Sequence, residues 1–433
     1  MKIYLDNCAT TRVCEEAAKA VWIAMTERYA NPSALHTAGQ EAEAVMKQAR
    51  RQIAQALSSK PENIVFTGNG TEADNLALFS AFYVKPGTIG GAGGAFRQRS
   101  LVVSAIEHAA VWRTARQLAD EGVRVDVVPV LGRGSEFPGM VDPREVRARL
   151  SENVHLVSVL HVNNEIGTIQ PVEDIARIVH TYAEEKGVRT AFHSDCIQSF
   201  GKFPIDTLRG EFRYVDYLAL SAHKIHGPKG VGALYARNPE RLHPMIFGGA
   251  QEGGVRGGTE NVPGIAGFGA AAKAMTADYV AHAKAANGCR RKLLEGIKAE
   301  IPDVLINSPE DASVTGKPGL CSPYILNVSF LGTRGEVILH ELEKSGIYVS
   351  TGAACSSIGG RQNAAPTGDA GQESVAAGPA ASRTLAAIGL SAKEAEGAIR
   401  FGFSREGSPK EMEFVVDRLK QAVARYRQVG SYR

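Results

Sequence analysis

The sequence predicts an α/β protein that has a large, mainly parallel, doubly wound sheet and a smaller α+β part. Short runs rich in Val, Ile and Leu alternate with helical patterns over the first 240 residues. These runs rarely alternate with polar residues, as expected for strands that helices cover on both faces. The chain has 433 residues, which is more than one ordinary core accommodates, so two or three domains are expected.

The elements of the large part follow one another along the chain. Strands are expected over residues 64–67, 101–106, 125–130, 154–161, 188–195, 215–221 and 231–236. Helical patterns lie between several of these strands, over residues 72–83, 109–121 and 172–185. Alternation of this kind favours parallel strands that are joined by crossover helices.

The pattern changes after a glycine cluster at residues 248–258. The elements expected beyond it are a long helix over 265–301, a strand over 324–330, a helix over 335–344, a strand over 347–350 and an amphipathic helix over 409–426. We therefore predict a large domain over residues 14–260 and a small domain formed by residues 1–13 and 261–433.

Two segments have the composition of loops. Residues 87–100 and 356–381 are rich in Gly, Ala, Ser and Gln and show no hydrophobic periodicity. We expect both to be mobile insertions.

Composition and charge exclude several classes of protein. The net charge is only +3 and no basic stripe is present, which argues against a nucleic-acid-binding protein. No run approaches the roughly 18 apolar residues that a membrane span needs, and the N-terminus has no signal-peptide core. Six scattered cysteines form no Cys-x-x-Cys pair, which fits neither a disulfide framework nor a zinc site. We expect free thiols, no metal and a cytoplasmic location.

Polar residues follow five of the predicted strands directly. They are residues 68–72, Glu107 with His108, residues 162–165, residues 196–198 and residues 222–224. Ligands of open α/β sheets bind beyond the carboxyl ends of the strands. One such cluster carries little information, but five of them indicate a single crevice.

The chemistry of these clusters selects among cofactors. The Gly-Asn-Gly-Thr-Glu stretch at residues 68–72 suits a phosphate at a helix N-terminus, or is simply a glycine-rich turn with Thr71 as N-cap. Asp195 could pair with a protonated ring nitrogen, and Lys224 could form a Schiff base. These three features are what a protein contributes to pyridoxal phosphate chemistry.

Two other cofactor classes fit less well. The glycine fingerprint of nicotinamide-binding proteins is absent from the required strand–turn–helix context. A zinc hydrolase that used His223 and His226 would place its cation beside Lys224 and Lys229, which would repel it.

Several motifs resemble those of one family. They are residues 4–7 (YLDN), residues 9–11, Asn31-Pro32-Ser33, Thr71-Glu72 with Asn75, Glu107-His108, residues 161–167 (HVNNEIG), Asp195 with Gln198, residues 221–224 (SAHK) with residues 227–230, residues 256–261 (RGGTEN) and residues 352–356 (GAACS). In this order and spacing they resemble the cysteine desulfurases, which are class V aminotransferase-like pyridoxal phosphate enzymes. The resemblance runs from about residue 3 to about residue 425.

The resemblance implies a fold and roles for individual residues. It implies the type I fold of pyridoxal phosphate-dependent transferases, with Lys224 holding pyridoxal 5'-phosphate, Asp195 pairing with its ring nitrogen and His108 stacking on its ring. The other implied contacts are Asn164 and Gln198 with the phenolic oxygen side, Gly70, Thr71, Ser221 and His223 with the phosphate, Thr259 with the cofactor of the second subunit of a homodimer, and Arg400 and Asn31 with the substrate carboxylate.

The resemblance also implies that Cys355 is the nucleophile. The enzyme would convert L-cysteine to L-alanine and pass the sulfur, as a persulfide on Cys355, to an acceptor or scaffold protein for iron–sulfur clusters or another sulfur-containing cofactor or transfer RNA. Small flanking residues suit an exposed thiol, and nearby positive charge would favour its thiolate. Without the resemblance, a small buried core residue is the commoner role of a free cysteine.

The chain also departs from the family pattern. Cys8 and Cys196 stand where alanine is usual, and we expect both to be small buried substitutes near the site. The loop after Cys355 is longer than usual. We expect it to be disordered without a partner and to hand sulfur to an acceptor.

Two alternatives to a desulfurase remain. A selenocysteine lyase or another β-eliminating relative would use the same cofactor residues without needing the Cys355 thiol. A non-catalytic scaffold would keep the fold alone, but the presence together of Lys224, His108, Asp195 and Cys355 argues against it.

Overall fold

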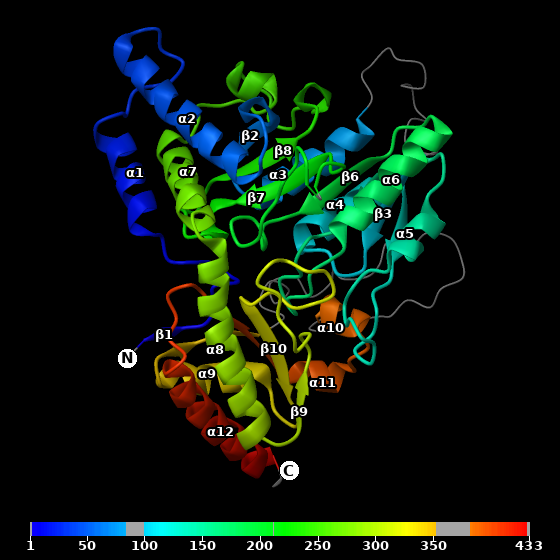
Figure 1. The fold of residues 1–433 in the computed structure, drawn as a ribbon, viewed down its shortest axis with the longest axis vertical. Helices are drawn as coiled ribbons and strands as arrows, with labels where there is room; N and C mark the ends of the chain where they lie inside the picture. The colour runs from blue at the N-terminus through cyan, green and yellow to red at the C-terminus, as the bar shows by residue number, and fades with distance from the viewer. Residues whose placement is uncertain (1, 84–98, 211, 352–381, 431–433) are drawn as a thin grey trace.

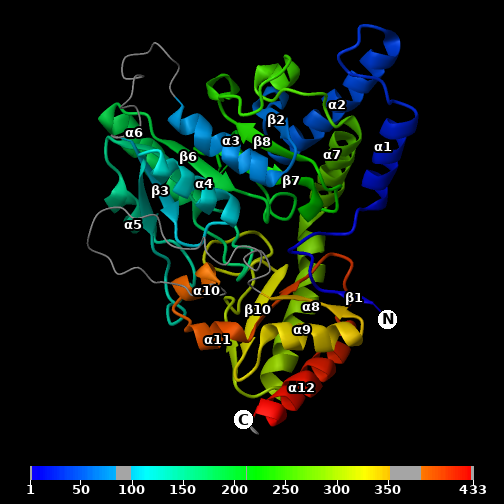
Figure 2. The ribbon, with the colours of Figure 1, turned by 180° about the vertical axis from the view of Figure 1, so that it is seen from behind.

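The computed structural model describes residues 2–83, 99–210, 212–351 and 382–430. A large sheet with its helices forms the upper part of Figure 1, and a smaller sheet with the remaining helices forms the lower part. The view from behind in Figure 2 shows the same two layers, with α8 running from one to the other. The predicted insertions lie almost wholly outside the described residues, as does Cys355.

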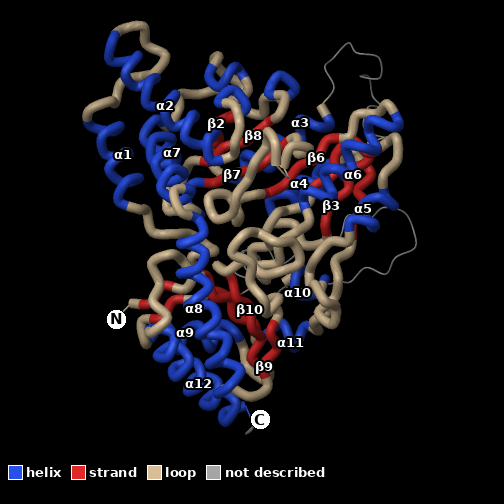
Figure 3. Tube along the Cα trace, in the orientation of Figure 1, coloured by secondary structure: helices blue, strands red, loops and turns tan. Residues whose placement is uncertain are grey.

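The large sheet has seven strands in the order β2-β8-β7-β6-β5-β3-β4. They are β2 (Ile64–Thr67), β3 (Ser100–Ser104), β4 (Arg124–Val128), β5 (Val154–Ser158), β6 (Ala191–Asp195), β7 (Tyr217–Ser221) and β8 (Gly232–Ala236). β8 is antiparallel to both of its neighbours, whereas the other pairings are parallel. All seven predicted strands and the mainly parallel sheet are confirmed. Figure 3 shows these strands gathered into one layer.

Helices cover both faces of this sheet. They are α1 (Glu15–Thr26), α2 (Thr37–Ala56), α3 (Gly70–Phe82), α4 (Ala109–Asp120), α5 (Pro143–Arg149), α6 (Val172–Lys186) and α7 (Val262–Thr276). Leu101 and Val103 pack with α3 and α4, whereas Val102 between them packs with the core of α2, α6 and α7. This alternation explains why the strands are apolar throughout, since successive side chains point to opposite faces.

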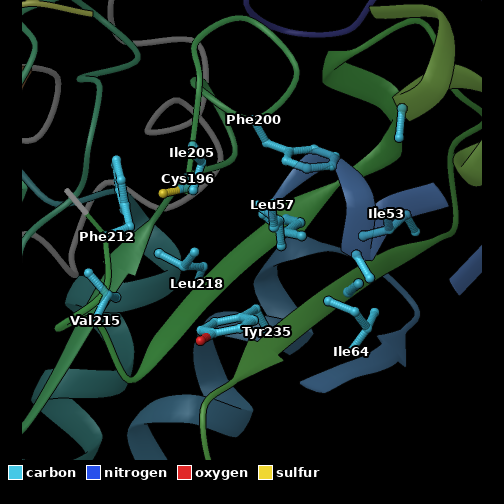
Figure 4. Close-up of a cluster of buried hydrophobic side chains, with 14 of the residues drawn as sticks. Ile53, Leu57, Ile64, Cys196, Phe200, Ile205, Phe212, Val215, Leu218 and Tyr235 are labelled. Atoms are coloured by element: carbon cyan, nitrogen blue, oxygen red, sulfur yellow. The ribbon is translucent and has the colours of Figure 1, made fainter. Parts of the chain in front are cut away.

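The core on the α2 side contains many large apolar side chains. Figure 4 shows Leu57 near its centre, with Phe200 and Ile53 close to it and Phe212 farther off on the other side. Cys196 lies in this core and is fully buried. It is therefore the small buried substitute that the sequence predicted.

The lower part contains a four-stranded antiparallel sheet in the order β12-β13-β10-β9. Its strands are β9 (Val304–Ile306), β10 (Ile325–Phe330), β12 (Ser350–Thr351) and β13 (Ala398–Gly402). Beside it, β1 (Ile3–Tyr4) pairs in parallel with β11 (Ile347–Tyr348). The helices of this part are α8 (Tyr279–Glu300), α9 (Gly335–Lys344), α10 (Arg383–Ala387), α11 (Ala392–Glu396) and α12 (Glu411–Gly430).

Short 3₁₀ turns complete the described elements. They are η1 (Pro61–Asn63), η2 (Ala222–Lys224), η3 (Pro239–Arg241) and η4 (Gln251–Gly254). Of the described helices, none is both long and apolar enough to cross a membrane.

Two predictions for the lower part are wrong. The single helix over 265–301 is two helices, because Asp278 adopts an extended φ and caps α8 through a hydrogen bond from the Ala281 amide (2.9 Å). The single strand over 347–350 is two short strands, β11 and β12, which pair with different partners.

The packing of α7 bears on the predicted division of the chain. Phe268, Ala271 and Met275 of α7 belong to the core of the large sheet, whereas Leu293 and Ile297 of α8 belong to the core of the lower part. Figure 1 shows α7 beside α1 and α2. We propose that the two parts meet between α7 and α8 rather than at residue 260.

Candidate active site

The predicted phosphate site is the turn between β2 and α3. The side chain of Asn69 caps α3 by accepting a hydrogen bond from the Glu72 amide (2.8 Å), so the alternative that Thr71 is the N-cap is wrong. Gly70 opens the helix, and a Cβ atom at this position would clash with the Ile197 side chain. The first N–H groups of a helix have no partner within it, so this N-terminus offers donors and a positive dipole end.

Ser221 and His223 add polar groups beside this turn. The Ser221 hydroxyl lies at the end of β7, is buried and has no hydrogen-bond partner among the described residues. The ring Nδ1 of His223 lies 3.3 Å from the Thr10 hydroxyl. Burial and the nearby Lys224 lower the pKa of His223 to about 4, so its ring is neutral at physiological pH.

Lys224 closes the turn that follows β7. Its Nζ donates hydrogen bonds to the backbone carbonyls of Cys8 and Ala9, the latter at 2.8 Å. The Gln198 amide also donates to the Cys8 carbonyl, at 2.9 Å. The N-terminal segment thus lies against the end of the large sheet, and it brings Lys224 and Gln198 to one point.

Asp195 and His108 face each other across this edge of the sheet. One polar side-chain atom from each of Asp74, His108 and Asp195 lies within 4.8 Å of the others. Asp195 ends β6 and accepts a hydrogen bond from the Ile197 amide (2.8 Å), and His108 caps α4 by accepting from the Ala110 amide (3.2 Å).

Burial sets the charges of these two groups. It raises the pKa of Asp195 to about 8, and the neighbouring Asp74 carboxyl adds to the effect. Burial, together with the nearby charges of Lys224 and Arg383, lowers the pKa of His108 to about 4. The site therefore favours a neutral imidazole and an acid that ionises fully only next to a cation.

Arg400 reaches this crevice from β13 of the smaller sheet. Its side chain is 6% exposed, donates to the Asn164 carbonyl (3.1 Å) and pairs with Asp6 (3.2 Å). Its Nε has no hydrogen-bond partner among the residues that the structure describes. Since residues 162–165 follow β5 of the large sheet, Arg400 contacts residues from both parts of the chain.

Two predicted residues lie apart from this group within one chain. Asn31 is exposed in the loop that joins α1 and α2, where its side chain accepts a hydrogen bond from the Ser33 amide (2.9 Å). Figure 1 shows this loop at the outer end of both helices, away from β10 and the smaller sheet to which Arg400 belongs. Thr259 is exposed as well. Cys355 lies outside the described residues.

Three residues of the site were missed by sequence reasoning. Asp74 lies on the buried side of α3, and Lys202 is almost fully buried, with its Nζ donating to the side-chain Oε1 of Gln198 (3.4 Å). Arg383 lies over the Trp112 ring, 4.1 Å from its centroid, and donates to the Ala105 carbonyl (3.2 Å). The sequence signal for Asp74 is an acid among apolar residues of a helix, because an aspartate is rarely fully buried unless it is paired.

Known proteins resemble this chain along its whole length. The family model of the aminotransferase class-V proteins matches residues 3–375. The cysteine desulfurase of Trichormus azollae is 35% identical over 100% of this chain and 95% of its own length.

Solved structures give the same result. A NifS-like protein has a TM-score of 0.80 and 32% identity, with 98% of this chain and 100% of that chain covered. SspA in complex with cysteine has a TM-score of 0.71 and 30% identity, with 94% and 100% covered. The chain belongs to the cysteine desulfurases of the aminotransferase class-V family.

Proposed function

We propose that this chain binds pyridoxal 5'-phosphate, converts L-cysteine to L-alanine and passes the sulfur as a persulfide on Cys355 to an acceptor or scaffold protein. The observation that carries the proposal is that Lys224, Asp195, His108 and Arg400 come together at one edge of the large sheet. A structure of SspA was solved in complex with cysteine, which supports this substrate class.

The residues of the crevice fit this cofactor. The unpartnered Ser221 hydroxyl and the backbone at Gly70, where no Cβ fits, suit a phosphate group. Asp195 suits a protonated ring nitrogen, because an adjacent cation would offset the cost of ionising a buried acid. Lys224 would hold the cofactor covalently. When bound, the cofactor withdraws electrons from the substrate and so makes its bonds easier to break.

Arg400 is the group that we assign to the substrate carboxylate. A guanidinium presents several N–H donors in a fork that matches a carboxylate, and burial strengthens the pairing. Its Nε has no partner among the described residues, and Asp6 occupies part of its donor capacity. We propose that the substrate carboxylate competes with Asp6 for this side chain.

His108 is suited to accept and return protons. Its neutral ring can take a proton from the bound substrate, and nearby cationic side chains disfavour its remaining charged. The position at the N-cap of α4 fixes the ring beside Asp195. This placement supports the role predicted for it against the cofactor ring.

Cys355 would carry out the transfer step. Its thiolate attacks the sulfur of the bound substrate, so that an S–S bond forms while the C–S bond breaks. The electron pair left on carbon takes up a proton, and alanine results. The same thiol then holds the sulfur for the acceptor, and we propose iron–sulfur clusters or another sulfur-containing product as its destination, in the cytoplasm.

Absorbance spectroscopy tests the proposal. Purified protein with cofactor should absorb near the edge of the visible range, and addition of L-cysteine should shift this band while alanine accumulates. Lys224→Ala should lose the band. Cys355→Ala should keep the band but form no persulfide. A protein without the band would refute the cofactor, and release of sulfide by Cys355→Ala at the wild-type rate would refute the role of the thiol.

A further inference from the structure

Asp74 is a buried acid that the proposed reaction does not yet use. It lies on α3, is 0% exposed, and neither of its side-chain oxygens accepts a hydrogen bond from any described residue. Asp216 provides a contrast, because its side chain is 27% exposed, accepts from the Phe192 amide (2.8 Å) and faces Arg237 (3.7 Å). A buried carboxylate that stays ionised is normally paired and hydrogen-bonded. Among the described residues, no group donates a hydrogen bond to Asp74, and the neighbour at ion-pair distance is a histidine rather than a lysine or arginine.

The nearest polar group to Asp74 belongs to a histidine. Asp74 Oδ1 lies 3.3 Å from Nε2 of His193, and Nδ1 of His193 lies 2.9 Å from the Ser158 hydroxyl. All three side chains are fully buried. On the other side, Asp195 and His108 lie within 4.8 Å.

Among the residues that the structure describes, no lysine or arginine compensates a negative charge on Asp74. Asp195, Glu107 and Cys196 each feel its charge, and they are acids themselves. Burial alone raises the pKa of Asp74 far above its ordinary value. Two ionised carboxylates this close would repel each other strongly.

We propose that Asp74 keeps its proton in the cofactor-bound enzyme, so that Asp195 carries the single negative charge at the ring-nitrogen end of the site. Asp74 is then a positioning residue that acts through Asp195. This inference rests on the proposed function, because it concerns the charge that the cofactor's ring nitrogen meets.

The position of His193 fits a protonated Asp74. If Nδ1 of His193 carries its hydrogen and donates to the Ser158 hydroxyl, then Nε2 is free to accept from the Asp74 carboxyl. Burial lowers the pKa of His193 to about 4, which also favours the neutral ring. The competing arrangement moves one proton and gives an ion pair between ionised Asp74 and charged His193.

Infrared spectroscopy separates the two arrangements. The cofactor-bound wild type at neutral pH should show the carbonyl stretch of a protonated carboxylic acid that is missing from cofactor-bound Asp74→Asn. Glu107→Gln is the matched control, because Glu107 is buried and burial raises its pKa to about 8. The Asp74 band should persist in Glu107→Gln. A wild-type minus Asp74→Asn difference spectrum without this band would overturn the proposal.

The absorbance of the bound cofactor gives a second readout. Asparagine is neutral like the protonated acid, so the pH midpoint of the absorbance change should stay within a few tenths of a unit in Asp74→Asn. Removal of an ionised carboxylate at this distance would instead shift it by about 1–3 units, which would contradict the inference. Asp195→Asn is the positive control and should shift the midpoint.

The design distinguishes failure of the inference from failure of the proposed function. A wild type that never acquires the cofactor band refutes the function, whereas a wild type with that band but no Asp74 carboxyl stretch refutes only the inference. If Asp74→Asn does not fold, wild type labelled with carboxyl-¹³C aspartate replaces it. One buried aspartate carboxyl should then keep the ¹³C chemical shift of a protonated acid at neutral pH. A spectrum without such a signal would overturn the proposal.

Discussion

Burial decides the charge of individual side chains in this site more than sequence neighbours do. His108, His161, His193 and His223 are all substantially buried, and burial lowers the pKa of each to about 4. In the same core, burial raises the pKa of Asp195 and Glu107 to about 8. These opposite shifts share one cause, which is the cost of a charge in an apolar surrounding. They give the site neutral bases beside neutral acids.

The free-energy cost of charging a buried group can be measured at His161. Its ring is buried edge-on against Phe212, with 5.1 Å between ring centroids, and its Nδ1 has no hydrogen-bond partner among the described residues. Between its ordinary pKa of 6.5 and the folded value of about 4, the unfolded chain binds a proton that the folded chain does not. Stability therefore falls as the pH drops through this window.

Replacement of this ring by an apolar one removes that dependence. Relative to His161→Phe, the wild type should lose about 2 kcal/mol of unfolding free energy between pH 7 and pH 5. Urea unfolding of both proteins at the two pH values checks this. His340→Phe on the surface of α9 is the control and should show no such difference. Parallel pH profiles for the wild type and His161→Phe would contradict the burial argument.

Arg400 provides the prediction for substrate binding. Arg400→Lys keeps the charge but loses the fork of N–H donors, so KM for L-cysteine should rise about tenfold or more while the cofactor absorbance stays unchanged. Steady-state kinetics with alanine detection measure this effect. Arg113→Lys on the exposed side of α4 is the control. An unchanged KM would remove Arg400 from the substrate site.

At the scale of elements, the turn η4 shows how a loop is held against the large sheet. Glu252 has a left-handed backbone (φ 48°), and its buried carboxylate pairs with Arg50 (2.6 Å) and accepts from the Phe66 amide of β2 (2.8 Å). Arg256 from the same loop pairs with Glu72 of α3 (3.0 Å). These contacts connect the loop that carries Thr259 to the elements of the phosphate turn.

Loss of the Glu252 carboxylate should therefore affect both stability and the loop. Glu252→Ala removes the carboxylate that pairs with Arg50, so the unfolding free energy should fall by about 3 kcal/mol. The Phe66 amide loses its acceptor and should exchange its hydrogen faster. Glu145→Ala breaks only an exposed pair with Arg149 and should cost less than about 1 kcal/mol. Equal costs for the two variants would show that the buried pair does not hold the loop.

At the scale of the whole molecule, a single chain leaves apolar and predicted site residues uncovered. Trp22, Met25, Tyr29 and Phe247 are all more than half exposed, and Thr259 is exposed on the loop near Phe247. Large exposed apolar side chains of this kind are typical of surfaces that bind a protein partner. We therefore propose that the enzyme is a homodimer, as the family resemblance implied, in which Thr259 contacts the cofactor of the second subunit.

The homodimer is tested by mass and by cofactor affinity together. Light scattering should give twice the mass of one chain. Thr259→Ala should keep that mass but bind the cofactor about tenfold more weakly, because one hydrogen bond to a charged phosphate is lost. Thr181→Ala, which changes an exposed threonine of α6, is the control. A monomeric mass with unchanged activity would refute the shared site.

The fold was predictable from the sequence where local patterns decide it. The strands of the large sheet, the mainly parallel order and the helices α3, α4, α6 and α9 follow from apolar runs and helical periodicity. The break between α7 and α8 was not predictable in this way, because a single capping aspartate inside an Ala-rich stretch interrupts no periodic pattern. Helices α1 and α2 were missed as well, although α7 packs directly against both.

The sequence by itself indicated the chemistry that we propose for the site. Its polar clusters follow strands that share one sheet. Its motifs resemble those of the cysteine desulfurases, and this resemblance predicted the roles of Lys224, His108, Asp195 and Arg400. Only the tertiary structure decided which of its side chains carry a proton and which residues lie next to one another in the site. Asp74, His193 and Lys202 belong to it through burial and through contacts between distant segments, and neither quantity is encoded at a single position of the chain.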